Sequence, residues 1–213
     1  MTPDFWLQRW QENRIGFHQS QINVHLEAYW SGLGIAPGST VFVPLCGKSL
    51  DMLWLAAQGY RVLGVELSPL AVNAFFEENG LTPEIERQQA FQRYRCGEIE
   101  ILCGDFFDLQ SSDLVQVAAV YDRASLIALP PDMRTRYAGK LHSLLPGGRP
   151  TLLITLDYPQ DERQGPPFAV SEAEVLELYA GQWQVEKIAS RDLRSENDRA
   201  QLNRFDEHVF VLR

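Results

Sequence analysis

Three segments of the sequence place small, acidic and apolar residues where they could bind a nucleoside. The first, Pro44-Leu45-Cys46-Gly47-Lys48-Ser49, follows a strand-length apolar run at 40–43. It is not a P-loop, because that motif needs a glycine where this chain has Phe42. It is not a dinucleotide fingerprint either, since that fingerprint has three glycines. What remains is a tight turn that lets a ligand approach the backbone, with a plain strand-to-helix turn as the alternative.

The second and third segments add acidic residues after the next two apolar strands. Glu66 follows the first turn by about 20 residues, where nucleoside-binding folds hold the ribose because a carboxylate accepts both hydroxyl protons. Asp105 could accept a hydrogen bond from an adenine amine, and Phe106 could form an apolar wall beside it. The alternatives are a strand-end glutamate without a role and an aspartate that caps a turn. An adenosine site without a phosphate cradle favours S-adenosylmethionine over NAD or ATP.

The cysteines and histidines do not have the spacing of a metal site or of a nucleophilic triad. The three cysteines form no CxxC pair, and the four histidines form no HxxxH or HExxH pair. We therefore expect no metal and no disulfide framework. Cys46 is interpreted as a small packed residue in the turn and not as a nucleophile.

Composition narrows the class of partner. The 213 residues suit one domain, and 19 Lys and Arg against 28 Asp and Glu give a net charge of −9. This balance argues against nucleic acids and anionic membranes as ligands. The first residues mix charges among apolar side chains, and no run approaches the ~18 apolar residues of a membrane span. We expect a cytoplasmic protein.

Strand-length apolar runs alternate with helical patterns along the chain. Strands are predicted at 40–43, 61–65, 98–102, 115–121, 151–156, 184–188 and 208–212, with an irregular strand at 92–95. Helices are predicted after Thr2-Pro3-Asp4 and at 23–33, 50–58, 68–79, 131–145 and 171–179. This order predicts an α/β fold with a mostly parallel sheet that helices cover on both faces. In such folds the ligand binds beyond the carboxyl ends of the strands.

The segments that carry this chemistry also carry a resemblance. They are Val43 to Ala56, Gly64 to Ser68, Tyr121 to Leu126, Gly165 to Phe168, and Trp6-x3-Trp10 followed by Gly16 to Gln19. In this order the chain resembles the thiopurine S-methyltransferase family from about residue 5 to its end. The match is weaker at 81–97 and at 191–204. The resemblance implies a class I (Rossmann-like) methyltransferase fold, with a seven-stranded sheet whose last strand is antiparallel. Residues 1–213 are then one domain, in which 1–35 form a helical cover over the cofactor.

The resemblance also implies roles for individual residues. It places S-adenosylmethionine against Trp10, Leu45, Glu66 and Arg123, with Asp105 and Phe106 in the adenine region, and the acceptor against Phe17 and Arg194. Each has a structural alternative. Trp6 and Trp10 could be a hydrophobic stripe, Phe17 plain core, Arg123 an ion-pair partner of Asp122, and Arg194 a solvated loop charge. Gly165 to Phe168 could form part of a lid or a rigid proline turn.

The implied reaction transfers a methyl group from S-adenosylmethionine to the sulfur of a thiopurine or another aromatic or heterocyclic thiol. Such thiols ionise near neutral pH, so we expect orientation to supply the rate. No general base is expected, and Arg123 has at most an electrostatic role. The alternative acceptor is another sulfur, selenium or tellurium compound. A non-catalytic nucleoside-binding module and an NAD dehydrogenase are the competing classes, and the missing glycines disfavour the latter. The family implies a monomer.

Overall fold

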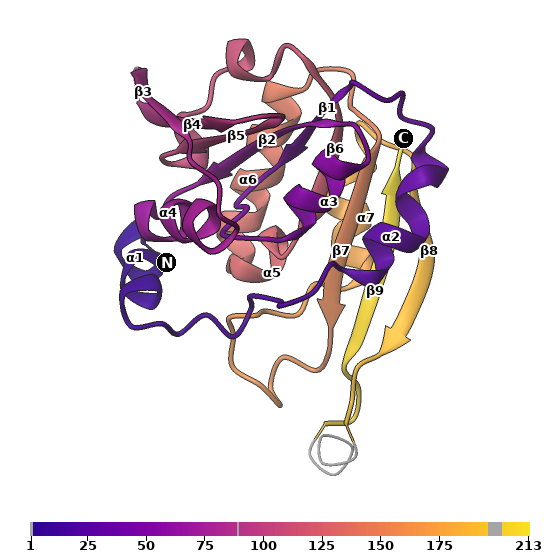
Figure 1. The fold of residues 1–213 in the computed structure, drawn as a ribbon. Helices are drawn as coiled ribbons and strands as arrows, with labels where there is room; N and C mark the ends of the chain where they lie inside the picture. The colour runs from indigo at the N-terminus through magenta and orange to yellow at the C-terminus, as the bar shows by residue number, and fades with distance from the viewer. Residues whose placement is uncertain (1, 89, 196–201) are drawn as a thin grey trace. The chain divides into compact units, whose positions relative to one another are not determined.

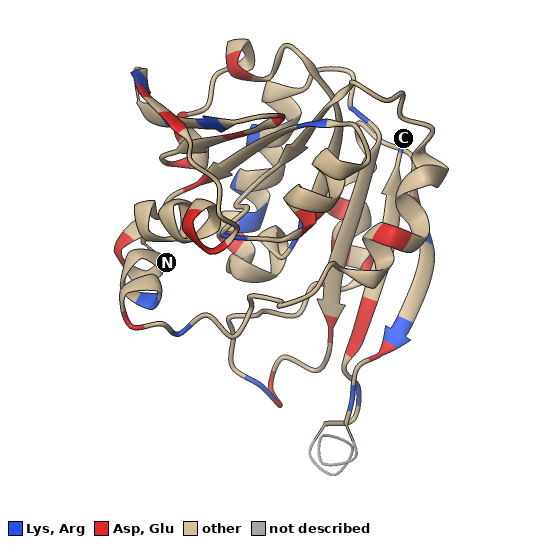
Figure 2. Cartoon of the chain, viewed as in Figure 1, with Lys and Arg blue, Asp and Glu red and all other residues tan. Residues whose placement is uncertain are grey.

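The computed structural model describes residues 2–88, 90–195 and 202–213 (Figure 1). The chain divides into two compact units, residues 1–121 and 122–213, and each is described by itself. Basic and acidic residues are scattered along both units and do not gather by sign in either (Figure 2). Among the described residues, no helix has the length and apolar character needed to cross a membrane.

In the first unit a mixed sheet carries the strands that lead into the predicted site. Its order is β3-β4-β5-β2-β1-β6, with β6 running into the second unit. The pairs β1–β2, β1–β6 and β2–β5 are parallel, whereas β4 is antiparallel to β3 and β5. The strands are β1 (Thr40–Val43), β2 (Arg61–Glu66), β3 (Glu84–Gln88), β4 (Phe91–Cys96), β5 (Ile99–Cys103) and β6 (Val117–Arg123). Nearly every residue of β1 and β2 is buried, as expected of strands covered on both faces.

The helices of the first unit begin where the sequence places capping residues. Asn23 accepts hydrogen bonds from the amides of residues 25 and 26, and Ser68 accepts one from the amide of residue 71. The helices are α1 (Pro3–Gln11), α2 (Val24–Tyr29), α3 (Asp51–Ala57) and α4 (Pro69–Glu78), with 3-10 turns η1 (Trp30–Leu33), η2 (Phe106–Asp108) and η3 (Ser111–Leu114). The helix predicted at 23–33 is therefore α2 followed by η1. The N-terminal helix α1 lies beside α4 (Figure 1).

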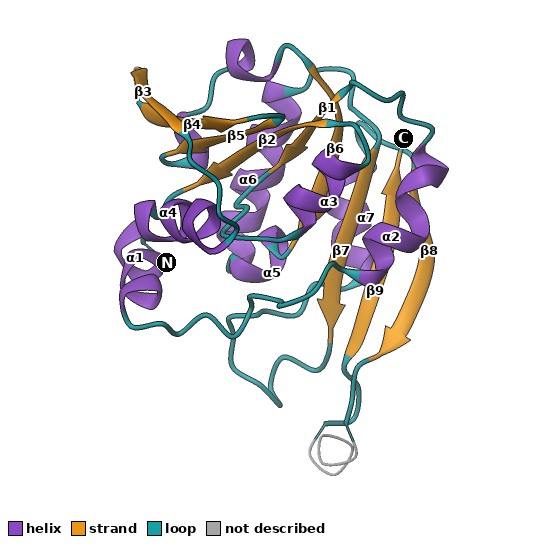
Figure 3. Cartoon of the chain, in the orientation of Figure 1, coloured by secondary structure: helices purple, strands orange, loops and turns teal. Residues whose placement is uncertain are grey.

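The second unit is an antiparallel sheet with helices. Its strands β7 (Thr151–Asp157), β8 (Val185–Asp192) and β9 (Asp206–Leu212) lie in the order β7-β9-β8. The last strand, β9, is antiparallel to both neighbours, which confirms the expected antiparallel end of the sheet. The helices are α5 (Ser125–Ala128), α6 (Pro131–Leu144) and α7 (Glu172–Tyr179) (Figure 3).

The strand count differs from the prediction. The described residues form nine strands where the family resemblance implied seven. The irregular strand predicted at 92–95 is β4, and β3, its antiparallel partner, was not predicted. Every residue of β3 is exposed, so the strand has no buried face and no apolar alternation. Its sequence Glu-Ile-Glu-Arg-Gln gives no strand signal, and pairing with β4 rather than side-chain burial maintains it.

Candidate functional site

The turn after β1 is held in a strained backbone conformation. Leu45 has a φ of +46° and Gly47 a φ of +53°. The left-handed region costs a non-glycine residue about 1–3 kcal/mol, and such residues cluster where a backbone clamps a ligand. The amide of Cys46 donates to the carbonyl oxygen of Val65 over 3.0 Å, which ties the turn to β2. The sequence predicted a tight turn here, but it gave no sign that a leucine would adopt this conformation.

Glu66 lies at the end of β2 with 7% of its surface exposed, and its carboxylate is bound by two backbone amides. The amide of Gly47 donates to Oε2 over 2.9 Å, and the amide of Ser68 donates to Oε1 over 2.8 Å. Burial raises the pKa of Glu66, and these amide hydrogen bonds oppose the rise. Each oxygen keeps further lone-pair capacity, so the carboxylate can also accept the two hydroxyl protons of a ribose.

An aromatic cluster made of Trp6, Trp10 and Phe17 stands beside this turn. The Phe17 ring centroid lies 5.8 Å from that of Trp6 and 5.6 Å from that of Trp10, both edge to face. The indole of Trp10 covers Gly47, where a Cβ atom would be 3.3 Å from Cζ2. No residue of α1 is fully buried, and Trp6 and Trp10 are half-buried, so the hydrophobic stripe and the aromatic wall both stay predictions. Trp6 contacts Phe17 as closely as Trp10 does, a partnership that the sequence left open.

Asp105 and Phe106 follow β5 next to the end of β2. The amide of Gly104 donates to the carbonyl oxygen of Glu66 over 2.9 Å. Asp105 Oδ1 accepts from the amide of Phe107 over 2.9 Å and caps η2, so its role as a turn cap is confirmed. Phe106 is 2% exposed. Contact of either residue with adenine stays a prediction, compatible with the capping role because the carboxylate has a second oxygen.

Arg123 is half-buried at the end of β6, in the second unit. Ala124 follows it with a φ of +69°, so the chain turns sharply after the arginine. The neighbouring Asp122 is 1% exposed and accepts a 2.7 Å hydrogen bond from the Tyr137 hydroxyl, which supports the structural role expected of it. Burial raises the pKa of Asp122 to about 6, against the hydrogen bonds from Tyr137 and Ser125.

The Arg194 side chain forms hydrogen bonds with residues that lie close to it in the sequence. Nε and Nη2 donate to the two carboxylate oxygens of Asp192 over 3.0 and 2.8 Å, and Nη1 donates to the carbonyl oxygen of Asn203 over 2.6 Å. The guanidinium thus joins the end of β8 to the segment before β9. A freely solvated charge does not describe it, and contact with an acceptor stays a prediction.

The segment from Gly165 to Phe168 is tightly packed. Its carbonyl oxygen at Pro167 accepts from the Tyr158 hydroxyl, and the amide of Phe168 donates to the carbonyl oxygen of Ile127 over 2.6 Å. A Cβ atom at Gly165 would lie 2.3 Å from Cδ1 of Phe168, so the ring closes over the glycine. These contacts favour the rigid turn over the lid.

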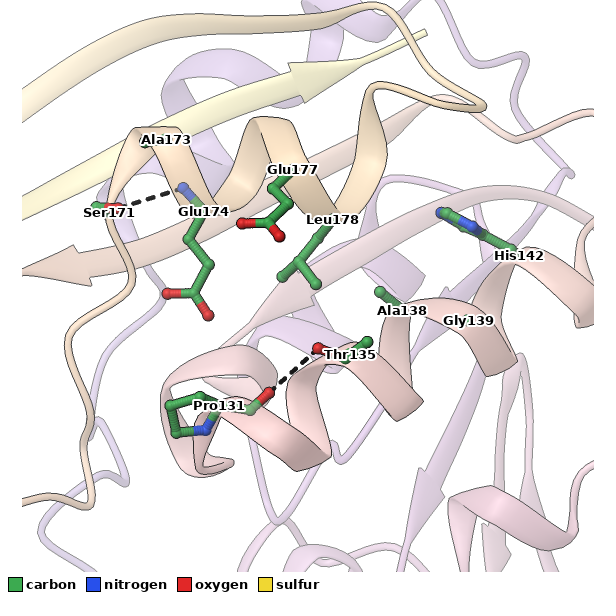
Figure 4. Close-up of a pocket in the computed structure, with 10 residues that line it drawn as sticks. All are labelled: Pro131, Thr135, Ala138, Gly139, His142, Ser171, Ala173, Glu174, Glu177 and Leu178. Atoms are coloured by element: carbon green, nitrogen blue, oxygen red, sulfur yellow. Dashed lines mark hydrogen bonds between the residues drawn. The ribbon is translucent and has the colours of Figure 1, made fainter.

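The second unit has an open groove between α6 and α7 (Figure 4). None of the predicted site residues lines it. Its lining is Pro131, Thr135, Ala138, Gly139, His142, Ser171, Ala173, Glu174, Glu177 and Leu178. Fixed hydrogen bonds within the two helices engage its polar side chains at Thr135 and Ser171. We assign this groove no chemistry.

Sequence reasoning missed a buried aspartate that organises the first unit. Asp51 is 1% exposed at the start of α3. Oδ1 accepts from the amide of Asn23 over 2.8 Å, and Oδ2 accepts from the Tyr121 hydroxyl over 2.8 Å. It therefore ties the N-cap of α2 to β6. The available signal was a single acid among the apolar residues 50–57.

Comparison with sequences of known families gives a match over the whole chain. The model of the family described as Thiopurine S-methyltransferase (TPMT) matches residues 1–213. A thiopurine S-methyltransferase of Nitrosospira multiformis is 52% identical over 215 residues, covering 100% of this chain and 98% of the relative. One of Pseudomonas entomophila is 55% identical over 193 residues, covering 91% of this chain and 89% of the relative.

Solved structures show the same fold at low identity. A SAM-dependent methyltransferase of Anabaena variabilis has a TM-score of 0.66 at 15% identity, covering 99% of this chain and 94% of that one. The 1,6-didemethyltoxoflavin-N1-methyltransferase of Burkholderia thailandensis, with bound S-adenosylhomocysteine, has a TM-score of 0.64 at 14% identity. That match covers 99% of this chain and 86% of the other. The fold is therefore that of SAM-dependent class I methyltransferases.

Proposed function

This chain belongs to the thiopurine S-methyltransferase family, and from that premise we propose how its residues carry out the transfer. The enzyme moves the methyl group of S-adenosylmethionine to the sulfur of a thiopurine or another aromatic or heterocyclic thiol. The observation that carries the proposal is the buried Glu66 carboxylate, held by two amides beside a strained turn. This arrangement keeps acceptor capacity where a ribose would need it.

The residues present fit S-adenosylmethionine. Glu66 would hold the ribose hydroxyls, and the turn at Leu45 would let the cofactor approach the backbone. Trp10 would cover the cofactor from α1, and an indole face attracts a sulfonium. Asp105 and Phe106 would hold the adenine, and Arg123 would contact the cofactor from the end of β6. When bound, the cofactor supplies a methyl group that its sulfonium already activates.

The chain's own residues then have to orient and shield the reaction. In-line displacement needs the acceptor sulfur about 3–3.5 Å from the methyl carbon, and positioning alone can supply several kcal/mol of the barrier. The acceptor ring would lie against Phe17, with Trp6 and Trp10 as the remaining walls of the aromatic cluster. Arg194 would contact the acceptor. No residue is assigned as a general base, because a thiol that ionises near neutral pH needs none.

The proposal is tested by turnover of the parent and of two glutamate variants on a thiopurine. We expect the parent to be active and Glu66→Ala to lose at least about 100-fold in kcat/KM, since hydrogen bonds to a charged acceptor are worth about 1.5–3 kcal/mol each. Glu100→Gln, on the neighbouring strand β5, is the matched control and should stay within about twofold. A parent that methylates no thiol but binds S-adenosylhomocysteine would contradict the proposal and favour a binding module.

The two proposed acceptor classes are distinguished by turnover assays with a thiopurine and with a small selenium or tellurium compound under the same conditions. Higher kcat/KM on the thiopurine supports the proposed substrate class, and higher kcat/KM on the other compound overturns it. We also propose that residues 1–213 act as one domain, with 1–35 as a cover over the cofactor, and that the enzyme is a cytoplasmic monomer. Sedimentation at working concentrations tests the last point.

A further inference from the structure

Lys48 is the last residue of the strained turn formed by residues 45–48, and it has no role in the function proposed above. Its ammonium donates to both carboxylate oxygens of Glu78, over 2.6 and 2.8 Å. The lysine side chain is 11% exposed, whereas that of Glu78 is 53% exposed. Glu78 is the last residue of α4, so the ion pair joins the turn after β1 to the far end of this helix.

The Lys48–Glu78 ion pair completes a closed series of contacts that links the turn, the Glu66 carboxylate and α4. One oxygen of Glu66 holds the amide of Gly47, next to Lys48, and the other holds the amide of Ser68. Ser68 is the N-cap of α4, and α4 ends at Glu78. A helix of this length is a stiff rod of about 15 Å. The turn is thus attached to α4 at both ends, by Glu66 at its start and by Lys48 at its end.

The aromatic cluster contacts the same turn and the same helix. α1 lies beside α4 (Figure 1). Its Trp10 covers Gly47, where a Cβ atom would be 3.3 Å from the indole. A shift of the turn away from α4 would therefore move both the amide that orients Glu66 and the surface under Trp10. Leu45 has a positive φ, which is costly for a residue with a side chain, so contacts around the turn have to hold this conformation.

We propose that Lys48 is a positioning residue for the cofactor: its ion pair with Glu78 fixes the turn of residues 45–48 against α4 and so holds the Glu66 carboxylate ready for the ribose. The inference rests on the proposed function. A partly exposed ion pair adds little to global stability, about 0–1 kcal/mol. Its effect is therefore expected in cofactor affinity and not in the unfolding transition, because small displacements of a binding group are costly.

The experiment measures S-adenosylhomocysteine binding by calorimetry, with steady-state turnover beside it. For Lys48→Met we expect the dissociation constant and the KM for S-adenosylmethionine to rise about tenfold, with kcat within about twofold. Glu78→Gln should act in the same direction. The double variant should bind S-adenosylhomocysteine no more weakly than whichever single variant has the higher dissociation constant, because both changes break the same contact. Lys48→Arg keeps the charge and should bind within about threefold of the parent.

The matched control is Lys187→Met, which removes the lysine of the Lys187–Glu172 ion pair in the second unit. It should leave S-adenosylhomocysteine affinity unchanged while altering the unfolding midpoint about as much as Lys48→Met. The inference is overturned if Lys48→Met binds as tightly as the parent, or if the two single variants weaken binding additively. A parent that does not bind S-adenosylhomocysteine would instead contradict the proposed function itself.

Discussion

Glu66 at the end of β2 in the first unit and Arg194 after β8 in the second are charged side chains that are held in different ways. Glu66 accepts amides from two separate segments and keeps lone pairs for a further donor. Arg194 directs its donors to Asp192 and to carbonyl oxygens at residues 202 and 203 of its own loop. The Glu66 carboxylate therefore keeps capacity for a ligand, whereas the hydrogen bonds of Arg194 within the described residues all go to residues 192, 202 and 203. We expect substitutions around Glu66 to have larger effects than substitution of Arg194.

The largest effect is expected at the buried Asp51, which holds together the segments of the first unit that carry the candidate site. Asp51→Ala leaves the buried amide of Asn23 and the Tyr121 hydroxyl without their acceptor. Because each unsatisfied buried donor costs about 1–3 kcal/mol, we expect the free energy of unfolding to fall by about 3 kcal/mol. Urea denaturation measures it, and a loss below about 1 kcal/mol would show that the N-terminal segment does not depend on Asp51.

The second test uses the corresponding buried aspartate of the other unit. The pKa of Asp122 is raised to about 6 from the ordinary 3.8. Its neutral form therefore stabilises the fold fully below about pH 3.8, and this stabilisation is lost as the pH rises through 6. Asp122→Asn keeps an acceptor for Tyr137 and cannot ionise. Between pH 4 and pH 8 its stability relative to the parent should rise by about 2–3 kcal/mol. A difference independent of pH would contradict this.

A third test separates cofactor binding from packing with two glycine variants. Gly47→Ala adds a Cβ atom at positive φ, 3.3 Å from Trp10. It should cost about 1–2 kcal/mol of stability and weaken S-adenosylhomocysteine binding about tenfold. Gly165→Ala, forced against the Phe168 ring, should cost at least as much stability, since overpacking costs about 1–3 kcal/mol. Its cofactor affinity should stay within about twofold. Equal losses of S-adenosylhomocysteine affinity in Gly47→Ala and Gly165→Ala would contradict the expected difference between the two segments.

The smallest effect is expected for Arg194→Ala. The Arg194–Asp192 ion pair lies at the surface, so stability should change by less than about 1 kcal/mol. If the arginine contacts the acceptor as proposed, the KM for a thiopurine should rise several-fold while the KM for S-adenosylmethionine stays constant. An unchanged acceptor KM would leave the hydrogen bonds to residues 192, 202 and 203 as the residue's whole role.

The sequence predicted the parts of the fold that burial dictates. The strand expected at 40–43 is β1, and the helix expected at 68–79 is α4 with its Ser68 cap, because continuous apolar runs and capping residues report local physics directly. β3 was missed because all its residues are exposed and its pairing with β4 depends on a distant partner. The other eight described strands correspond to the seven predicted strands and the irregular strand predicted at 92–95, which is β4.

The sequence predicted which residues form the candidate site, but it could not predict the hydrogen bonds that these residues make. Spacing made Glu66 a candidate but left a strand-end glutamate without a role as an equal alternative, and the family resemblance decided between the two. The spacing could not reveal that Gly47 and Ser68 would orient the carboxylate, since this depends on the positive φ of Leu45 and on the start of α4. Nor could it show that Arg194 would donate to Asp192 and to the carbonyl oxygen of Asn203.

Calorimetry with S-adenosylhomocysteine tests whether the Glu66 carboxylate is the preformed anchor of the cofactor. The parent, Glu66→Ala and Arg194→Ala are titrated under one set of conditions. We expect Glu66→Ala to bind S-adenosylhomocysteine at least about 100-fold more weakly than the parent, and Arg194→Ala to bind it within about twofold of the parent. A Glu66→Ala variant that binds as tightly as the parent would contradict this expectation.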